Sequence, residues 1–287
     1  MKFIFSFIFV LILSANYALA ACNITMFNIG HGDAIFIETD TENILVDTGN
    51  FSARSIIADK LSLKIPDKLF LSHPHADHIA NAAFIVDNFG VTDIFDNGIV
   101  STSPYYLDYI SSGANIHHVS AGDIIKIDDH TDFKIFHSGG NFAKLNDTST
   151  VMLFTYKNFK MLFTGDIEIA AETALKNIGK IDVLKAPHHG SKTSSNLNFI
   201  RAIRPDTVII SADGSYNFPH AESLNSYKMA GVSDIFCTDF NGEIRIVTDG
   251  FGYNISVDNP CAWIDTKIAD NRRIISATEL SITDSTE

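Results

Sequence analysis

Residues 73–78, with the sequence His-Pro-His-Ala-Asp-His, place three imidazoles and one carboxylate within six positions. The segment follows a short apolar stretch that predicts a buried strand, and it precedes a predicted helix. Alternate side chains of an extended chain point the same way, so His73 and His75 share one direction. The turn into the helix carries Asp77 and His78 to a second position. Nitrogen and oxygen donors of this kind are typical of zinc or manganese sites.

Two later apolar strands are also followed by residues of the types that bind metal ions. A Thr-Gly-Asp turn presents Asp166, and one carboxylate can bridge two ions roughly 3.5–4 Å apart, as two-metal hydrolases require. Further on, His188 and His189 follow another strand, where one imidazole can complete a metal site and the other can contact substrate. Six of the eleven histidines lie in residues 73–78, in this pair or at His220, and such clustering disfavours chance surface histidines.

Hydroxyl side chains follow this histidine pair. Ser191, Thr193 and Ser194 stand at the expected start of a helix over Ser194–Ile203. The free N–H groups of a helix start attract anions, so these residues predict an anion contact. An ordinary helix cap is the alternative interpretation.

The chain repeats one pattern in its two halves. A strand leads to an Asp-bearing turn, a helix and a second strand that ends in His, first from Asp47 to His73 and again from Asp166 to His188. Two such halves predict a β-sandwich with helices outside and a site at the edge where the strands end. A helix is expected over Ile79–Asn88.

No linker is evident inside the central part of the chain, so we expect one domain over residues 21–262. The polar residues 263–287 predict a loose C-terminal tail. Residues 1–20 have the features of a secretory signal peptide: one early lysine, an apolar stretch too short to span a membrane and a final Ala-Leu-Ala. A secreted or periplasmic protein is therefore expected. The sequence Leu-Ala-Ala-Cys ending at Cys22 also resembles a lipobox, which leaves a lipid-anchored envelope protein open.

Three cysteines bear on the same question. Export favours disulfides, and Cys22 and Cys261 flank the expected domain, so a bridge between them is one alternative to a lipidated or free Cys22. Cys237 lies in an apolar run and predicts a buried free thiol. The chain has no Cys-x-x-Cys pair, which excludes a zinc site built from cysteines.

Charge restricts the class of partner. The net charge is −13, and it becomes −14 once the signal peptide and its single lysine are removed. Proteins that coat nucleic acid are usually basic, and this chain has no basic run. Stable coating of nucleic acid is therefore excluded, and a short or single phosphodiester is a better substrate than a long polyanion.

The order of the motifs, H-x-H-x-D-H, then T-G-D, then H-H-G-S, resembles the metallo-β-lactamase superfamily. Within it, the chain is similar to the hydrolase domain of ComEC-type competence proteins. Residues 27–34, 146–149 and 218–221 resemble that group's opening strand-turn, N-x-x-S and Y-G-H-P elements. The resemblance implies an α+β fold, a four-layer αββα sandwich with a two-metal hydrolytic site.

The resemblance also implies roles for individual residues. Six of them would ligate two divalent ions, zinc or else manganese: His73 and His75 for one ion, Asp77 and His78 for the other, Asp166 as the bridge, and His189 in preference to His188 as the last ligand. Asp47 would orient a ligand histidine, and His220 would face the substrate. Thr148 stands where many members have a further histidine, so the His73/His75 ion lacks a ligand that water or Asn146 would supply.

The leading functional hypothesis is metal-dependent hydrolysis of a small or polymer-borne phosphodiester. Asp77 would orient or deprotonate the attacking water, and His188 or His220 would stabilise or protonate the leaving group. The alternatives are hydrolysis of a β-lactam or lactone at the same site, an extracellular nuclease, and a metal-binding envelope protein without catalysis. No transmembrane span and no particular oligomeric state is predicted.

Overall fold

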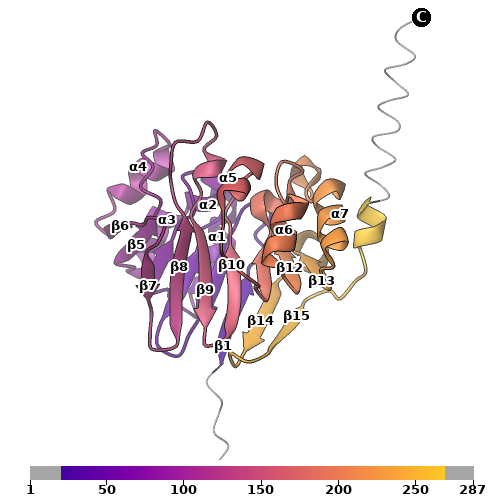
Figure 1. The fold of residues 1–287 in the computed structure, drawn as a ribbon. Coiled ribbons are helices and arrows are strands. Elements are labelled where there is room, and N and C mark those ends of the chain that lie inside the picture. The colour runs from indigo at the N-terminus through magenta and orange to yellow at the C-terminus, as the bar shows by residue number, and fades with distance from the viewer. Residues whose placement is uncertain (1–20, 269–287) are drawn as a thin grey trace, which may run out of the picture.

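The computed structural model describes residues 21–268, which form two mixed β-sheets (Figure 1). The predicted signal peptide and residues 269–287 lie outside the described residues. The first sheet has the order β15-β14-β1-β2-β3-β4-β5-β6, and its strands are β1 (Cys22–Met26), β2 (Ile35–Glu38), β3 (Asn43–Val46), β4 (Lys68–Phe70), β5 (Asp93–Asp96), β6 (Asn115–His118), β14 (Ile244–Thr248) and β15 (Tyr253–Val257). The second has the order β13-β12-β11-β10-β9-β8-β7, and its strands are β7 (Ile124–Lys126), β8 (Thr131–His137), β9 (Val151–Tyr156), β10 (Phe159–Phe163), β11 (Val183–Lys185), β12 (Thr207–Ile210) and β13 (Asp234–Cys237).

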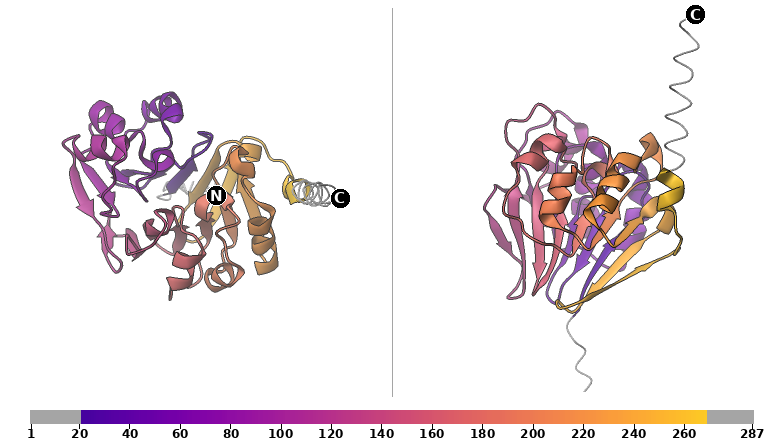
Figure 2. Two further views of the ribbon diagram at one scale, coloured as in Figure 1. Left: turned by 90° about the horizontal axis from the view of Figure 1, so that it is seen from above. Right: turned by 45° about the vertical axis from the view of Figure 1, so that its right-hand side comes forward.

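Helices cover the outer faces of both sheets. The α-helices are α1 (Arg54–Leu61), α2 (Ala76–Ile79), α3 (Ala82–Phe89), α4 (Pro104–Ile110), α5 (Ile169–Ala174), α6 (Leu197–Ile203), α7 (Ala221–Ala230) and α8 (Thr238–Asn241), and the short 3₁₀ turns are η1 (Phe51–Ala53), η2 (Asn146–Thr148), η3 (Pro187–Gly190) and η4 (Ser215–Asn217). Seen from above, the purple helices of the first half and the orange helices of the second lie on opposite sides of the sheets (Figure 2).

Three apolar clusters hold these layers together. Met26 and Phe133 belong to the cluster between the sheets, Ile57 to the one beneath the first set of helices, and Ile200 to the one beneath the second. Each cluster removes large aliphatic and aromatic side chains from water, which is the main favourable term in folding. The predicted four-layer αββα sandwich is confirmed.

The two halves of the chain bring their functional turns to one edge. Strands β3 and β4 are parallel, and so are β10, β11 and β12. Parallel strands end on the same side of a sheet, so Asp47 and His73 follow one pair while Asp166 and His188 follow the other. The repeated strand, turn, helix and strand pattern therefore corresponds to the observed topology.

Two helices differ from the expected ones. The predicted helix over Ile79–Asn88 is divided into α2 and α3, because the Asn81 side chain donates to the carbonyls of Thr48 and Asn50. The predicted helix from Ser194 begins only at Leu197. Strands β5 and β15 and helix α4 had not been predicted.

The hydroxyls expected at the start of that second helix have another role. Ser194 Oγ donates to the carbonyls of Pro187 and Ser191, at 2.9 Å in each case. The cap of α6 is Asn196, whose Oδ1 accepts from the N–H of Asn198 at 2.9 Å. The hydroxyls therefore stabilise the loop before the helix, and the predicted anion contact at the helix start is not supported.

The packed part of the chain extends beyond the expected boundary at residue 262. Trp263 stacks on Phe240 with ring centroids 4.5 Å apart, and its Nε1 donates to Asn241 Oδ1 at 3.0 Å. Trp263 and Ile268 are both buried. The mainly polar composition of residues 263–287 predicts a loose tail and gives no sign that Trp263 and Ile268 pack against the domain.

The three cysteines are unpaired. Cys22 is fully buried in β1, while the exposed Cys261 donates to the carbonyl of Phe240 at 3.4 Å. The Cys22–Cys261 bridge, one of the alternatives left open for Cys22, is therefore not formed, since one thiol lies in the core and the other at the surface. Cys237 is buried and free, as predicted. Within residues 21–268, no helix combines the length and apolar character needed to cross a membrane.

Candidate metal centre

Asp47 fixes the orientation of His78. The chain leaves β3 with Asp47 in a left-handed conformation, and its N–H donates to the carbonyl of Phe70 at 2.8 Å. Asp47 Oδ1 accepts from the N–H of Ser72 at 2.7 Å, and Oδ2 lies 2.8 Å from His78 Nδ1. A carboxylate beside Nδ1 holds the proton on that nitrogen and leaves Nε2 free for a ligand. This is the position that the family resemblance implied for Asp47.

His189 is held in the same manner from the other sheet. Its Nδ1 donates to the carbonyl of Ser211 at 2.9 Å. Its Nε2 lies 3.4 Å from Asp77 Oδ2 and 3.5 Å from Asp166 Oδ2. The side chain is fully buried, so the free imidazole nitrogen faces these two carboxylates and not solvent.

The four residues Asp77, His78, Asp166 and His189 form one cluster, here called the metal-ligand cluster. One potential ligand atom from each lies within 4.8 Å of the others. His78 Nε2, Asp166 Oδ1 and His189 Nε2 are buried without a hydrogen-bond partner. Buried polar atoms nearly always have a partner, so three such atoms around one point fit a divalent cation. The residues present therefore match the ion that the fold implies.

The electrostatics of the cluster favour positive charge at its centre. Burial opposes protonation of His78 and His189, but nearby carboxylates outweigh it: the pKa of His78 rises well above its usual value, and that of His189 rises to about 10. For Asp166, burial favours the neutral form, yet the two histidines hold its pKa well below the usual range. A divalent cation would supply the positive charge that these protons supply in its absence.

Lys185 and Asp33 lie next to the cluster and were missed by sequence reasoning. Lys185 is 1% exposed, forms an ion pair with Asp33 and donates to the carbonyl of Gly165 at 3.1 Å. Its Nζ also lies 3.7 Å from Asp166 Oδ1. The signal was a lysine inside an otherwise apolar strand, which is costly unless the charge is paired.

His73 and His75 form a second, smaller group. His73 Nε2 and His75 Nδ1 lie 2.9 Å apart, so both nitrogens face one point. Burial lowers the pKa of both side chains, which keeps them neutral. Thr148 adds no ligand, because its hydroxyl donates to the carbonyl of Leu145 at 2.7 Å. Asn146 Oδ1 is buried without a partner and is a candidate for the missing ligand.

An open cavity of about 380 Å³ gives access to both groups. Its lining includes Asp77, Asp166 and His188, together with the rings of His31, Tyr216 and Phe218, and it contains no lysine or arginine. His188 Nε2 lies 3.9 Å from Asp166 Oδ2. The geometry therefore separates the histidine pair: His189 belongs to the metal-ligand cluster, and His188 lines the cavity.

His220 is not brought to the cavity. Its Nδ1 accepts from the N–H of Lys192 at 3.2 Å, and its ring packs 5.1 Å from that of Phe218. The lining of the cavity does not include it. The contact with substrate expected for His220 therefore has no support from this geometry.

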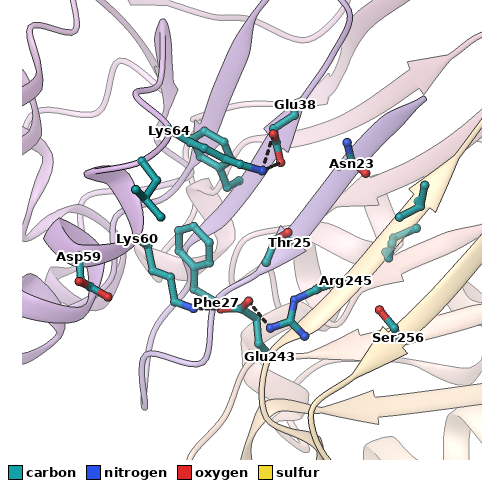
Figure 3. Close-up of a pocket in the computed structure, with 14 residues that line it drawn as sticks. Asn23, Thr25, Phe27, Glu38, Asp59, Lys60, Lys64, Glu243, Arg245 and Ser256 are labelled. Atoms are coloured by element: carbon teal, nitrogen blue, oxygen red, sulfur yellow. Dashed lines mark hydrogen bonds and ion pairs between the residues drawn. The ribbon is translucent and has the colours of Figure 1, made fainter. Parts of the chain in front are cut away.

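A larger cavity of about 460 Å³ lies elsewhere, between α1 and the outer face of β1, β2 and β14 (Figure 3). Most of its charged side chains pair with one another: Lys64 with Glu38, and both Lys60 and Arg245 with Glu243. Since it contains no buried, unpartnered ligand atom among the described residues, we place the functional site at the smaller cavity.

Comparison with known proteins agrees with the fold and the motifs. A family model described as the metallo-beta-lactamase superfamily matches residues 28–214. The chain is 28% identical over 253 residues to ComE operon protein 3 of Bacillus subtilis and 28% identical over 233 residues to Recombination protein 2 of Haemophilus influenzae. These matches cover 77% and 76% of this chain but only 32% and 28% of those proteins, so the chain spans about a third of their length.

Solved structures support the same architecture. Igni18, a metallo hydrolase from Ignicoccus hospitalis, matches with a TM-score of 0.52 and 17% identity, over 81% of this chain and 98% of that one. The metallo-beta-lactamase fold protein YhfI of Bacillus subtilis matches with a TM-score of 0.51 and 12% identity, over 75% of this chain and 96% of that one. At these identities the solved structures show a similarity of fold alone. The family match shows that the chain belongs to the metallo-β-lactamase superfamily, and with the metal-ligand cluster it identifies the chain as a metal-dependent hydrolase.

Proposed function

We propose that the protein is an exported phosphodiesterase that hydrolyses small or polymer-borne phosphodiesters. The observation that carries the proposal is a buried cluster of unpartnered metal-ligand atoms that opens onto a cavity without lysine or arginine. A phosphate group entering this cavity meets no cationic side chain in its lining, so its binding would depend on metal ions. The resemblance to competence-protein hydrolase domains supports a phosphodiester as the bond that is cleaved.

Two divalent ions would be held unequally. Asp77, His78, Asp166 and His189 would hold one ion, and His73 and His75 would hold the other, with Asp166 as the bridge. Zinc is the preferred metal because of the number of imidazoles, and manganese is the alternative. Bound divalent ions would polarise the phosphoryl oxygens and make the attacking water more acidic.

The chain's own side chains would position the reactants. Asp77 Oδ2 lies 3.1 Å from His31 Nε2, so the imidazole fixes this carboxylate at the cavity wall. From there Asp77 would orient the attacking water or accept its proton. His188 Nε2 lies 3.9 Å from Asp166 Oδ2 and 3.3 Å from Asn146 Nδ2, and from this position His188 would contact the leaving-group oxygen.

Charge and size limit the substrate. A net charge of −13 gives no long-range attraction for a polyanion. The cavity volume of about 380 Å³ lies near the lower end of the range of roughly 300–1,000 Å³ found for small-ligand sites. A single phosphodiester, free or displayed on an envelope polymer, therefore fits better than a long strand of DNA.

The test is hydrolysis of bis(p-nitrophenyl) phosphate by the chain without residues 1–20. We expect turnover that a chelator abolishes and added zinc or manganese restores. The variant His130→Ala, at an exposed histidine remote from the site, should retain the wild-type rate. An absence of metal-dependent turnover would contradict the proposal, as would faster turnover of nitrocefin, which reports β-lactam hydrolysis. Efficient cleavage of long DNA would favour a nuclease.

A further inference from the structure

One aromatic side chain that lines the cavity remains largely exposed to solvent. Tyr216 is 73% exposed, although burying an aromatic ring is among the most favourable contributions to folding. It lies in η4 with a φ of 56°, and the next residue, Asn217, has a φ of 60°. Asparagine tolerates this left-handed conformation, whereas for a residue such as tyrosine it costs about 1 kcal/mol or more. The loop therefore holds the exposed Tyr216 ring at the cavity in an unfavourable backbone conformation.

The loop fixes this ring by several contacts. The N–H of Asn217 donates to the carbonyl of Gly214 at 3.1 Å, and the N–H of Ser215 donates to Asp213 Oδ1 at 2.9 Å. The Tyr216 ring lies 5.3 Å from the ring of His31 and 5.7 Å from that of Phe218. These contacts support the ring from the cavity wall, and most of its surface remains open.

The rings next to Tyr216 pack against one another. Phe218 is only 7% exposed, and it stacks against His31 and His189 with interplanar angles of 25° and 29°. A quaternary ammonium group is usually held by a cage of several aromatic faces. Of the rings that line the cavity, Tyr216 is the most exposed, which favours stacking with one flat ring.

We propose that Tyr216 forms a stacking subsite for one planar ring of the substrate, the nucleobase of a short nucleotide, beside the metal-ligand cluster. The inference rests on the proposed phosphodiesterase function and specifies its substrate class. Tyr216 lines the same cavity as Asp77 and Asp166, so a ring stacked on it would belong to the group whose phosphate reaches the cluster. Stacking also needs no cationic side chain, in agreement with the lining of the cavity.

The test compares two phosphate monoesters, thymidine 5′-monophosphate and methyl phosphate, by calorimetric titration of the zinc-loaded chain. Wild type should bind the nucleotide more tightly than methyl phosphate. Tyr216→Ala should reduce this preference about tenfold, as expected for loss of one stacked base. Tyr216→Phe, which keeps the ring, should retain the preference. Phe251→Ala is the matched control, because Phe251 is also exposed, at 76%, and lies in the turn between β14 and β15; both dissociation constants should stay at the wild-type value.

Phosphocholine is titrated in the same way as a third monoester. Three results would overturn the inference: wild type shows no preference for the nucleotide, Tyr216→Ala leaves the preference unchanged, or Tyr216→Ala loses more affinity for phosphocholine than for the nucleotide. The last result would assign the ring to a cationic headgroup. Binding of a monoester requires no turnover. A failed hydrolysis assay with bis(p-nitrophenyl) phosphate is therefore distinguishable from a failed stacking subsite.

Discussion

The two parts of the His-x-His-x-Asp-His motif lie in different surroundings. His78 and Asp77 join Asp166 and His189 in a group of four ligand atoms within 4.8 Å of one another. His73 and His75 face one point with two nitrogens. Among the residues described, neither belongs to a group of three or more possible ligand residues whose atoms lie within 4.8 Å of one another.

The outer contacts of the two groups differ as well. His78 Nδ1 lies 2.8 Å from the Asp47 carboxylate, and His189 Nδ1 lies 2.9 Å from the Ser211 carbonyl. His73 Nδ1, in contrast, contacts a hydroxyl, Ser72 Oγ, at 3.1 Å. A carboxylate or carbonyl makes a ligand histidine more basic and fixes its ring. One sequence motif therefore supplies ligands to one well-organised half-site, the metal-ligand cluster, and one weak half-site, His73 and His75.

The largest effect is expected from Asp166→Asn. The substitution removes the charge of the residue that is proposed to bridge both half-sites. Replacing a residue that only hydrogen-bonds to a metal ligand costs about 10–100-fold in metal affinity or activity. For Asp166→Asn we therefore expect turnover to fall by at least about 100-fold, and elemental analysis should find neither ion bound. Asp129→Asn, at an exposed position, serves as the control and should behave as wild type. Retention of two ions by Asp166→Asn would refute the bridging role.

A smaller effect is expected from Asp47→Asn. The amide keeps the size of the side chain but loses the negative charge beside His78 Nδ1. Affinity for the tightly held ion should fall about 10–100-fold, measured by competition with a chromophoric chelator. If only the weakly held ion were affected, the assignment of Asp47 to the well-organised half-site would be wrong.

Asn146→Ala tests the weak half-site. Its buried Oδ1 has no partner and is the candidate third ligand beside His73 and His75. We expect about a tenfold or smaller loss of affinity for the second ion, with the first ion retained, as read from a metal titration. Loss of the first ion would show that the two half-sites are not separable in this way.

The smallest effect on the site is expected from Glu172→Gln, which lies outside both half-sites. Glu172 is buried, and its carboxylate accepts from the N–H groups of Ser195 and Asn196, in the loop that follows His189. Burial raises the pKa of Glu172 from 4.5 to about 7. The folded state therefore binds the proton more tightly than the unfolded chain, and this group's contribution to stability decreases as the pH rises from about 4.5 to 7.

Glu172→Gln should remove this contribution. We expect the stability of wild type relative to the variant to fall across that pH range by at most about 3 kcal/mol. Urea unfolding of both proteins at pH 5 and pH 7.5 measures the difference. Equal pH dependence in the two proteins would show that the Glu172 carboxyl titrates normally. Metal-dependent turnover should change little.

Much of the fold followed from local sequence patterns. Short apolar strands, the Asp-bearing turns and the repeated order of elements predicted two similar halves and a site at one edge. The ligand residues were recognisable because imidazoles and carboxylates cluster at strand ends, as in residues 73–78. The start of α6 was misplaced because Ser194 bonds within its own loop, whereas the actual cap is Asn196.

Other parts of the site depend on contacts between distant segments. Lys185 lies in an apolar strand, and only the fold brings Asp33 to it across more than 150 positions of sequence. The separate roles of His188 and His189 depend on backbone geometry at adjacent residues, which spacing cannot resolve. Tyr216 belongs to no motif, so its place at the cavity could not be predicted.

Metal content directly tests whether the edge where the strands end carries two unequal half-sites. The chain without residues 1–20 would be loaded with zinc, dialysed against metal-free buffer and analysed by mass spectrometry for metal per chain. We predict one retained ion, with a second bound only in the presence of excess zinc. No retained ion, or two ions retained with equal affinity, would show that the two half-sites do not differ as described.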